Sequence, residues 1–279
     1  MTTEEDSQGE HEVHAGIRQR VLTLKTLHGE RERIMKDYVV ERAQLEAKYQ
    51  ALVQPLYQKR ANVVLGVHDE ESDDKDEVRG IPQFWVLTLA QNEVLADILT
   101  EEDISCLESL QDIQCLDNQN GDGFTLTFHF SANDFFENSV LTKKYEVPNL
   151  FLSDEPMLKS VQGCEIQWKD GKCLTFSETT QKQRGKGKNK GQMRNVVKKE
   201  RKDSFFHFFA SPKLPSLESM NEDEAVRLEA EFNMDYDVAQ AFRSQIVPNA
   251  VVWYTGDDDD LEAAMDELEW PEGQEPADE

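Results

Sequence analysis

The segment from Asn118 to Gly123 carries oxygen-bearing side chains spaced as in the first half of a calcium-binding loop, with Asn118, Asn120 and Asp122 at alternate positions before the glycine. An EF-hand loop needs an aspartate first and a bidentate glutamate twelfth, whereas this chain has Asn118 and His129 at those places. The flanking residues alternate in hydropathy, as strands do, where an EF-hand needs helices. The Asn-Gly-Asp-Gly sequence is instead typical of a hairpin turn, so we expect no calcium site.

No other group of residues has the spacing of a catalytic, cofactor or metal site. The chain lacks glycine-rich phosphate-binding loops and the HExxH and GxSxG motifs. Its six histidines are scattered, and its 56 acidic residues are too numerous for any two of them to indicate acid–base catalysis. Cys106, Cys115, Cys164 and Cys173 form no CxxC pair, which indicates free thiols in a reducing compartment. We therefore expect a protein that is not an enzyme and uses no cofactor or metal.

Charge is the strongest chemical signal in the sequence. Lysine and arginine total 30 against 56 acidic residues, a formal net charge of −26. Such a surface repels phosphates, which excludes direct high-affinity DNA binding and favours a basic partner. From Lys182 to Lys202, ten basic residues and one acid give a charge of +9, so the other residues carry −35. The last 23 residues, from Asp257 onward, hold twelve acids and no base.

Composition divides the chain into five regions. Residues 1–14, 67–80 and 257–279 are acidic and poor in large apolar residues, so we expect a disordered N-terminus, an acidic linker and a disordered acidic tail. Residues 15–66 and 81–256 carry the patterns of ordered structure. No apolar run is long enough for a transmembrane helix, and the acidic N-terminus is not a secretory signal.

Residues 15–66 predict one long helix, which Pro55 should kink or stop. Apolar residues recur at alternating spacings of four and three, the 3.5-residue repeat of a coiled coil. Forty residues of helix span about 60 Å, whereas the following domain would be only about 40 Å across. We therefore expect the stripe to pair with a second copy in a homodimer; the alternative is a helix folded back on its own monomer. The predicted dimer interface consists of Ile17, Val21, Leu24, Met35, Tyr38, Leu45, Tyr49, Leu52 and Leu56.

Residues 81–256 predict an α+β domain with an antiparallel sheet. Ile81–Leu110 is expected to be helical, with Thr100 and Asp103 spaced as a capping box. Asn221–Ile246 is expected to be a helix that Pro248 ends, and the basic segment is expected to form a protruding hairpin over about 174–204. Strands are predicted at Ile113–Leu116, Phe124–Phe130, Val140–Val147, Glu165–Trp168 and Leu174–Glu178.

Short motifs follow one another along the two ordered regions: LEAKY at 45–49, QPLYQKR at 54–60, IPQFW at 81–85, TEED at 100–103, GCEIQWK at 163–169, SFFHFF at 204–209, IVPNAV at 246–251 and YTG at 254–256. In this order they resemble the nucleosome assembly protein family of histone chaperones over about residues 15–256. The closing motifs and the phenylalanine-rich motif resemble the nucleosome assembly protein 1 branch more than the SET/template-activating-factor branch.

The resemblance implies a homodimer of paired long helices and two α+β domains whose acidic concave face holds core histones. The implied cargo is chiefly the histone 2A–2B dimer, also the histone 3–4 pair, with linker histone as a further candidate. An import receptor, shuttling between cytoplasm and nucleus, and deposition of histones in nucleosomes are implied as well. The acidic tail is short for the family. The competing interpretation is an acidic adaptor or phosphatase inhibitor of the SET type.

The acids expected to face histones cluster near the last predicted helix and in the tail. Single exposed ion pairs contribute about 0–1 kcal/mol each, so affinity requires many of them together with counterion release, and binding should weaken steeply with salt. Because such pairs break one at a time, the cargo could pass to DNA without nucleotide hydrolysis. The set is Glu222, Asp223, Glu224, Glu229, Glu231, Asp235, Asp237, Asp257, Asp258, Asp259, Asp260, Glu262, Asp266, Glu267 and Glu269.

The basic hairpin has three interpretations: a nuclear import signal, a contact with the acidic surface of a neighbouring dimer, or a solvated loop. The pattern favours the import signal most. A leucine-rich segment, Val21–Leu27, could serve in nuclear export or only in dimer packing. The predicted import residues are Lys186, Lys188, Lys190, Lys198, Lys199, Arg201 and Lys202.

Overall fold

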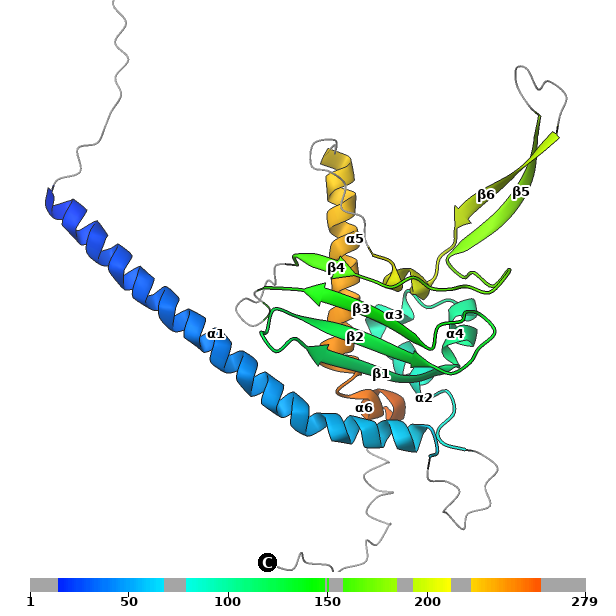
Figure 1. Ribbon diagram of the computed structural model, residues 1–279, viewed down its shortest axis with the longest axis horizontal. Coiled ribbons are helices and arrows are strands. Elements are labelled where there is room, and N and C mark those ends of the chain that lie inside the picture. The colour runs from blue at the N-terminus through cyan, green and yellow to red at the C-terminus, as the bar shows by residue number, and fades with distance from the viewer. Residues whose placement is uncertain are drawn as a thin grey trace, which may run out of the picture.

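A long helix leads into an α+β domain in the computed structural model, which describes residues 15–67, 79–148, 150, 158–184, 193–211 and 222–256. Helix α1 (Ala15–Val64) extends away from the domain over its N-terminal half and lies along one side of it near its C-terminal end (Figure 1). The predicted acidic N-terminus, the tail and nearly all of the linker lie outside the described residues. No described helix is both long and apolar enough to span a membrane.

Pro55 lies inside α1 and does not end it. Proline has no N–H to donate to the carbonyl one turn earlier, and its ring crowds that turn. The helix therefore bends toward its C-terminal end (Figure 1) but continues to Val64. The bend turns this end onto the domain, where the Ile81 N–H donates to the Val64 carbonyl at 2.9 Å. Gly80 has φ 63°, and a Cβ there would lie 2.3 Å from the Val64 oxygen, so this turn requires glycine.

Four strands form an antiparallel meander in the order β1 (Leu110–Asp117), β2 (Gly123–Phe130), β3 (Val140–Glu146) and β4 (Ser160–Gln162). The first three confirm predicted strands, and β1 and β2 pair across the predicted Asn-Gly-Asp-Gly turn, with one register shift between Leu110 and Asp112. Alternate residues of β2 are fully or almost fully buried, as a sheet with one covered face requires.

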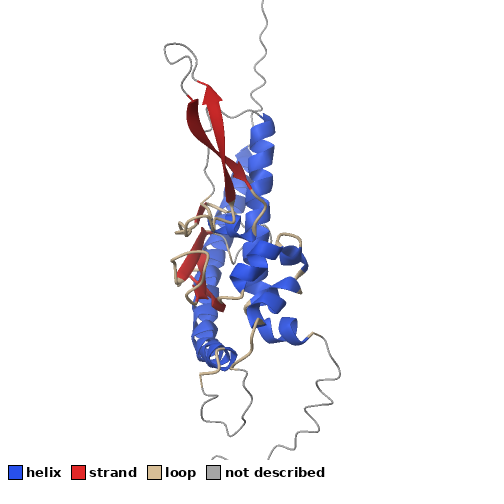
Figure 2. Cartoon of the chain, turned by 90° about the vertical axis from the view of Figure 1, so that its right-hand side faces the viewer, coloured by secondary structure: helices blue, strands red, loops and turns tan. Residues whose placement is uncertain are grey.

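Helices cover one face of this sheet, so the domain has two layers (Figure 2). They are α2 (Phe84–Ala90), α3 (Glu93–Ala96), α4 (Glu101–Leu107), α5 (Glu222–Ala241) and α6 (Ala250–Thr255). The predicted helical segment 81–110 is thus three short helices, because Asn92 and Thr100 have extended backbones and start new ones. The capping box of Thr100 and Asp103 is confirmed.

Aromatic side chains fill the space between the layers. The ring of Phe128 on β2 lies 5.0–6.3 Å from those of Phe208, Phe209 and Phe242. Two of these come from a short 3₁₀ helix, η3 (Phe205–Phe209), in which four of five residues are phenylalanine. Edge-to-face packing of this kind stabilises a core beyond its area of burial.

Two strands and the last predicted helix also differ from the sequence predictions. Glu165–Trp168 is not a strand: Trp168 makes one isolated bridge to Phe136, and Asn138 side-chain atoms bond the Glu165 carbonyl and the Gln167 N–H. The short β4 was not predicted. The predicted helix 221–246 becomes α5 and a single π-helical turn, η4 (Phe242–Ile246), and Pro248 is followed by a further helix, α6.

A two-stranded sheet of β5 (Phe176–Arg184) and β6 (Met193–Arg201) projects from the domain (Figure 1). It lies within the predicted hairpin of residues 174–204. The predicted strand from Leu174 begins at Phe176, because Leu174 and Thr175 are buried in the domain. The Lys202 N–H donates to the Thr175 carbonyl at 3.0 Å and closes the foot of the hairpin.

Candidate functional site

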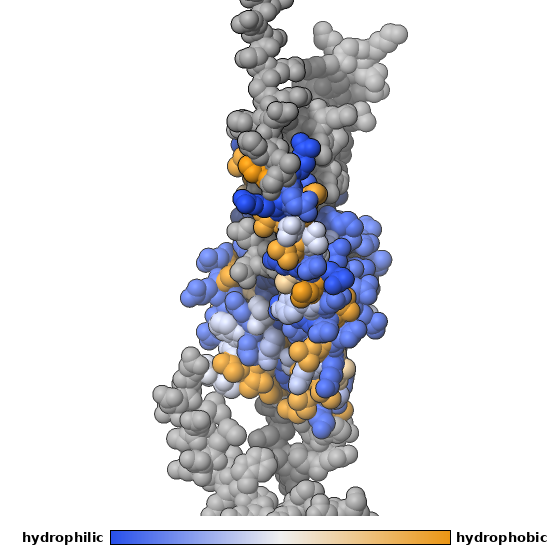
Figure 3. Space-filling view, turned by 90° about the vertical axis from the view of Figure 1, so that its left-hand side faces the viewer, coloured by the Kyte–Doolittle hydropathy of each residue, from blue (hydrophilic) through white to orange (hydrophobic). Residues whose placement is uncertain are grey.

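The apolar stripe of α1 is open to solvent in the single chain. Eight of the nine predicted interface residues expose between 42 % (Val21) and 64 % (Leu24) of their surface, and Met35 is half-buried. Figure 3, which views the side where α1 lies, shows apolar residues on this face. A series of large apolar side chains exposed along one helix marks a surface that another molecule covers.

The opposite side of α1 is fixed to the domain near its C-terminal end. Ala43 and Ala61 are each 4 % exposed, and the Gln50 side chain donates to the Cys115 carbonyl of β1 at 3.3 Å. The Arg60 guanidinium donates to the Val247 carbonyl at 2.6 Å and lies over the rings of Tyr57 and Trp85. These contacts orient the helix so that its stripe faces away from its own domain.

Helix α5 carries seven of the predicted histone-facing acids. Glu231 and Asp237 are exposed, and within the described residues neither carboxylate has an ion pair. Glu222, Asp223, Glu224 and Glu229 lie on the same helix, but their side chains are outside the described part, as is the whole of Asp257–Glu269. Among the described acids, Glu231 and Asp237 are therefore the ones available to a basic partner on α5.

Asp235 has an internal role, in contrast to its predicted place on the binding surface. Its carboxylate accepts hydrogen bonds from the Lys143 ammonium at 2.5 Å and the Tyr145 hydroxyl at 2.9 Å. Lys143 is fully buried on β3 and also bonds the carbonyls of Phe208 and Ala210. Burial lowers the pKa of Lys143, and the adjacent Asp235 opposes that shift. Burial raises the pKa of Tyr145, and the adjacent carboxylate of Asp235 raises it further. Asp235 thus ties α5 to the sheet.

A second ion pair holds the C-terminal end of the same helical segment. Arg243 in η4 donates two hydrogen bonds to Asp117 at the end of β1, at 2.7 and 2.9 Å. Burial alone would lower the pKa of Arg243, but the bonds to Asp117 outweigh it and raise the pKa. Sequence reasoning missed both anchors. The detectable signal was Lys143, which occupies an inward position of an alternating strand and so had to be paired.

The basic residues of β6 are engaged within the hairpin and at its foot. Lys199 pairs with Glu178 across the two strands at 3.1 Å, and Lys198 pairs with Glu200 at 2.8 Å. Lys202 pairs with Glu102 of α4. Arg201 is exposed, and Lys186, Lys188 and Lys190 lie outside the described residues. The described import candidates of β6, which are Lys198, Lys199 and Arg201, therefore lie in a paired strand.

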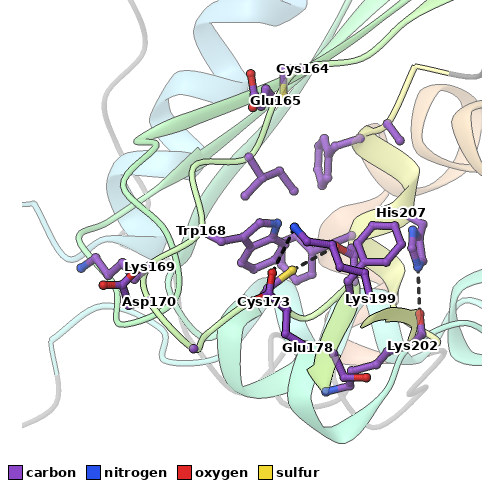
Figure 4. Close-up of a pocket in the computed structure, with 18 residues that line it drawn as sticks. Cys164, Glu165, Trp168, Lys169, Asp170, Cys173, Glu178, Lys199, Lys202 and His207 are labelled. Carbon is purple, nitrogen blue, oxygen red and sulfur yellow. Dashed lines mark hydrogen bonds and ion pairs between the residues drawn. The ribbon is translucent and has the colours of Figure 1, made fainter. Parts of the chain in front are cut away.

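A groove of about 810 Å³ lies between the 163–178 segment and the foot of the hairpin (Figure 4). Its apolar lining includes Ile166, Trp168, Phe176 and Phe206. Charged side chains of both signs surround this lining. It is larger than a second cavity in the described part of the chain, which has about 290 Å³ and is lined by Asn118 and Lys144.

No arrangement of titratable groups in the described part of the chain supports catalysis. No cluster of three or more His, Cys, Asp or Glu side chains there could hold a metal ion. Burial raises the pKa of the Cys106 and Cys115 thiols to about 12, so neither is a thiolate nucleophile at neutral pH. Burial also raises the pKa of Asp112.

Comparison with known proteins places this architecture in one family. Residues 19–257 match the family model described as nucleosome assembly protein (NAP). Nucleosome assembly protein 1;3 of Nicotiana tabacum is 39 % identical over 264 residues, which cover 90 % of this chain and 67 % of the relative. Nucleosome assembly protein 1;2 of Oryza sativa subsp. japonica is 37 % identical over 265 residues, covering 90 % and 71 %.

Solved structures agree with these sequence matches. Nucleosome Assembly Protein 1 from Plasmodium knowlesi superposes with a TM-score of 0.65 at 28 % identity, covering 88 % of this chain and 99 % of that one. The nucleosome assembly protein from Plasmodium falciparum gives 0.59 at 26 % identity, with 88 % and 99 % covered. The family model spans most of the chain and the relatives and solved structures agree with it, so the chain belongs to the nucleosome assembly protein family, in its nucleosome assembly protein 1 branch.

Proposed function

We propose that this protein is a histone chaperone that binds core histones through exposed acidic side chains and deposits them during nucleosome assembly. The proposal rests on membership of the nucleosome assembly protein family and on the strong negative charge of the chain. The proposed cargo is chiefly the histone 2A–2B dimer and also the histone 3–4 pair, with linker histone as a further candidate. The single observation that carries it is the coincidence of family membership with a charge of −35 outside the basic hairpin.

The proposed working unit is a homodimer joined through α1. The exposed stripe from Ile17 to Leu56 supports this, because leaving it in water would cost about 25 cal/mol for each Å² of apolar surface. Two copies would carry −52, twice the −26 of one. A field of that size concentrates a polycation near the surface and speeds its encounter with the protein.

Release follows from the same weak pairs that bind. Each solvated pair between an exposed acid such as Glu231 or Asp237 and a histone arginine or lysine contributes only about 0–1 kcal/mol. DNA can displace these contacts one at a time, so transfer needs no nucleotide hydrolysis. The acidic shell thus prevents non-specific histone–DNA contacts until DNA takes over the cargo.

The test is a binding and assembly assay with purified core histones. Affinity for the histone 2A–2B dimer and the histone 3–4 pair should be measured at several salt concentrations. It should fall steeply as salt rises, because salt screens the charges and makes the release of counterions on binding less favourable. A plasmid supercoiling assay should then show deposited nucleosomes. Tight binding that ignores salt, or no deposition, would overturn the proposal.

Nuclear traffic is a second part of the proposal. The basic hairpin is the candidate import signal; Lys198 and Lys199 are in ion pairs on β6, and Lys186, Lys188 and Lys190 lie outside the described residues. Val21–Leu27 is the candidate export segment; its exposure also fits dimer packing. Deleting residues 185–192 should reduce nuclear accumulation without changing the dimer, and unchanged import would remove the signal from the hairpin.

The competing function is an acidic adaptor or phosphatase inhibitor of the SET type. Both functions use an acidic surface, so affinity for histones alone does not separate them. The supercoiling assay does, because an adaptor would bind histones without depositing them.

A further inference from the structure

The groove at the foot of the hairpin has an apolar floor. The lysines that line it have partners within the chain, whereas two of its described carboxylates do not. Trp168 is half-buried and points into the groove (Figure 4), where its ring packs edge-on against Phe206 with centroids 5.5 Å apart. Phe176 is 42 % exposed at the start of β5. Apolar surface that remains open between two segments of one chain gains free energy when a partner covers it.

The lysines of the groove are already occupied. Lys199 pairs with Glu178 at 3.1 Å, and Lys202 pairs with Glu102. Lys169 donates to the Asn133 carbonyl at 2.7 Å. The basic side chains that line the groove therefore have their charges or donors directed to partners within the chain.

Two carboxylates on the groove are in the opposite situation. Glu165 and Asp170 are exposed, and neither carboxylate has a hydrogen bond or ion pair to any described residue. Figure 4 shows them at separate places along the 163–171 side of the groove. The uncompensated charge at this apolar groove is therefore negative.

We propose that this groove binds an extended, lysine- and arginine-rich tail segment of a histone. A long basic side chain has an aliphatic stem and a cationic head, which match the floor at Trp168 and Ile166 and the free carboxylates of Glu165 and Asp170. A cation near the indole face gains further attraction. The volume of about 810 Å³ suits a few extended residues, whereas a folded histone core needs a far larger interface. This inference rests on the proposed function and adds a second, tail-specific site to it.

The test uses the full-length protein with both carboxylates reversed, Glu165→Lys with Asp170→Lys. Both residues are exposed, so the fold should be kept, and circular dichroism checks this. The control, Glu93→Lys with Asp97→Lys at the two ends of α3, changes the net charge equally at two other exposed acids. The probes are synthetic N-terminal tail peptides of the core histones and histone pairs with and without tails, measured by isothermal titration calorimetry.

We expect the groove variant to bind tail peptides about tenfold more weakly than the control variant, since two attractive contacts become repulsive. Its affinity for tailless histone pairs should equal that of the control. Equal loss of peptide affinity in both variants would mean that only the overall charge matters, and would overturn the groove site. Failure of the wild-type protein to bind tailless pairs would instead count against the proposed acidic surface on α5, so the two failures are distinguishable.

Discussion

Replacing Asp235 with alanine should cost far more folding free energy than the same change at Asp237, two residues further along α5. Asp235→Ala leaves the fully buried ammonium of Lys143 with two backbone carbonyls and no counter-ion. Removing one partner of a buried ion pair costs about 3–5 kcal/mol. If Lys143 instead released its proton, deprotonating a lysine of ordinary pKa at pH 7 would cost about 4.6 kcal/mol. Both routes give a similar loss.

Such a loss is a large share of the roughly 5–15 kcal/mol that stabilises a typical domain. Urea unfolding followed by circular dichroism, at one fixed protein concentration, measures it. Asp237 is exposed, so Asp237→Ala should change the unfolding free energy by less than about 0.5 kcal/mol. The pair Lys143→Met with Asp235→Leu should recover most of the loss, because apolar residues of similar volume often replace a buried ion pair without cost.

The same variants test the division of labour on α5. Under the proposed function, Asp237→Ala weakens histone binding slightly at low salt and leaves stability unchanged. Asp235→Ala lowers the stability and leaves histone binding by the folded protein unchanged. Equal stability of the two alanine variants would refute the internal role of Asp235, and an undiminished loss in the double variant would show that packing, and not charge, causes it.

Three further predictions concern other parts of the molecule. Leu52→Glu should dissociate the proposed dimer in analytical ultracentrifugation, whereas Val40→Glu, which is similarly exposed but lies off the stripe, should not. A monomeric Val40→Glu variant would argue against the stripe as the dimer interface. Burial raises the Asp112 pKa, so the folded state binds its proton more tightly, and the contribution of Asp112 to stability should fall as pH rises from about 3.8 through that raised pKa; an Asp112→Asn variant should lack this step in pH-dependent unfolding. Gly163→Ala should lower the melting temperature, because its Cβ would lie 1.9 Å from the Phe209 carbonyl oxygen, whereas Gly29→Ala, with nothing within 4 Å, should raise it slightly; a stable Gly163→Ala variant would mean that the backbone there can move.

Features with a regular period were predictable from the sequence. The spacing of apolar residues in α1, the alternation in β2 and the capping box at Thr100 each depend on residues close together in the chain. Local spacing determines which residues share a face, so these predictions needed no knowledge of the tertiary structure. The hairpin turn before β2 follows from the same kind of local signal.

Features that depend on distant partners were not predictable. Ile166 and Trp168 alternate with exposed residues as in a strand, yet this segment forms only an isolated bridge to Phe136. The Asn138 side chain bonds the Glu165 carbonyl and the Gln167 N–H, two backbone groups that a neighbouring strand would need. Asp235 resembles its acidic neighbours in sequence, and only the position of Lys143, 92 residues earlier, makes it internal. Pro248 ends one helix as predicted, but Val247 and Ala250 are buried, so packing against α2 allows a further helix to form immediately afterwards.

Salt affects the internal acids much less than the exposed ones. Asp103, Asp117 and Asp235 are bonded inside the fold, where ions screen weakly. The remaining excess of negative charge repels itself across the surface and destabilises the compact state, and added salt screens that repulsion. Raising the salt concentration should therefore stabilise the fold while it weakens the proposed histone binding. A histone that supplies the missing positive charge acts on the fold as salt does. Bound cargo and native structure then support each other, and the empty chaperone, with its charge uncompensated, is the state that most readily accepts the next histone.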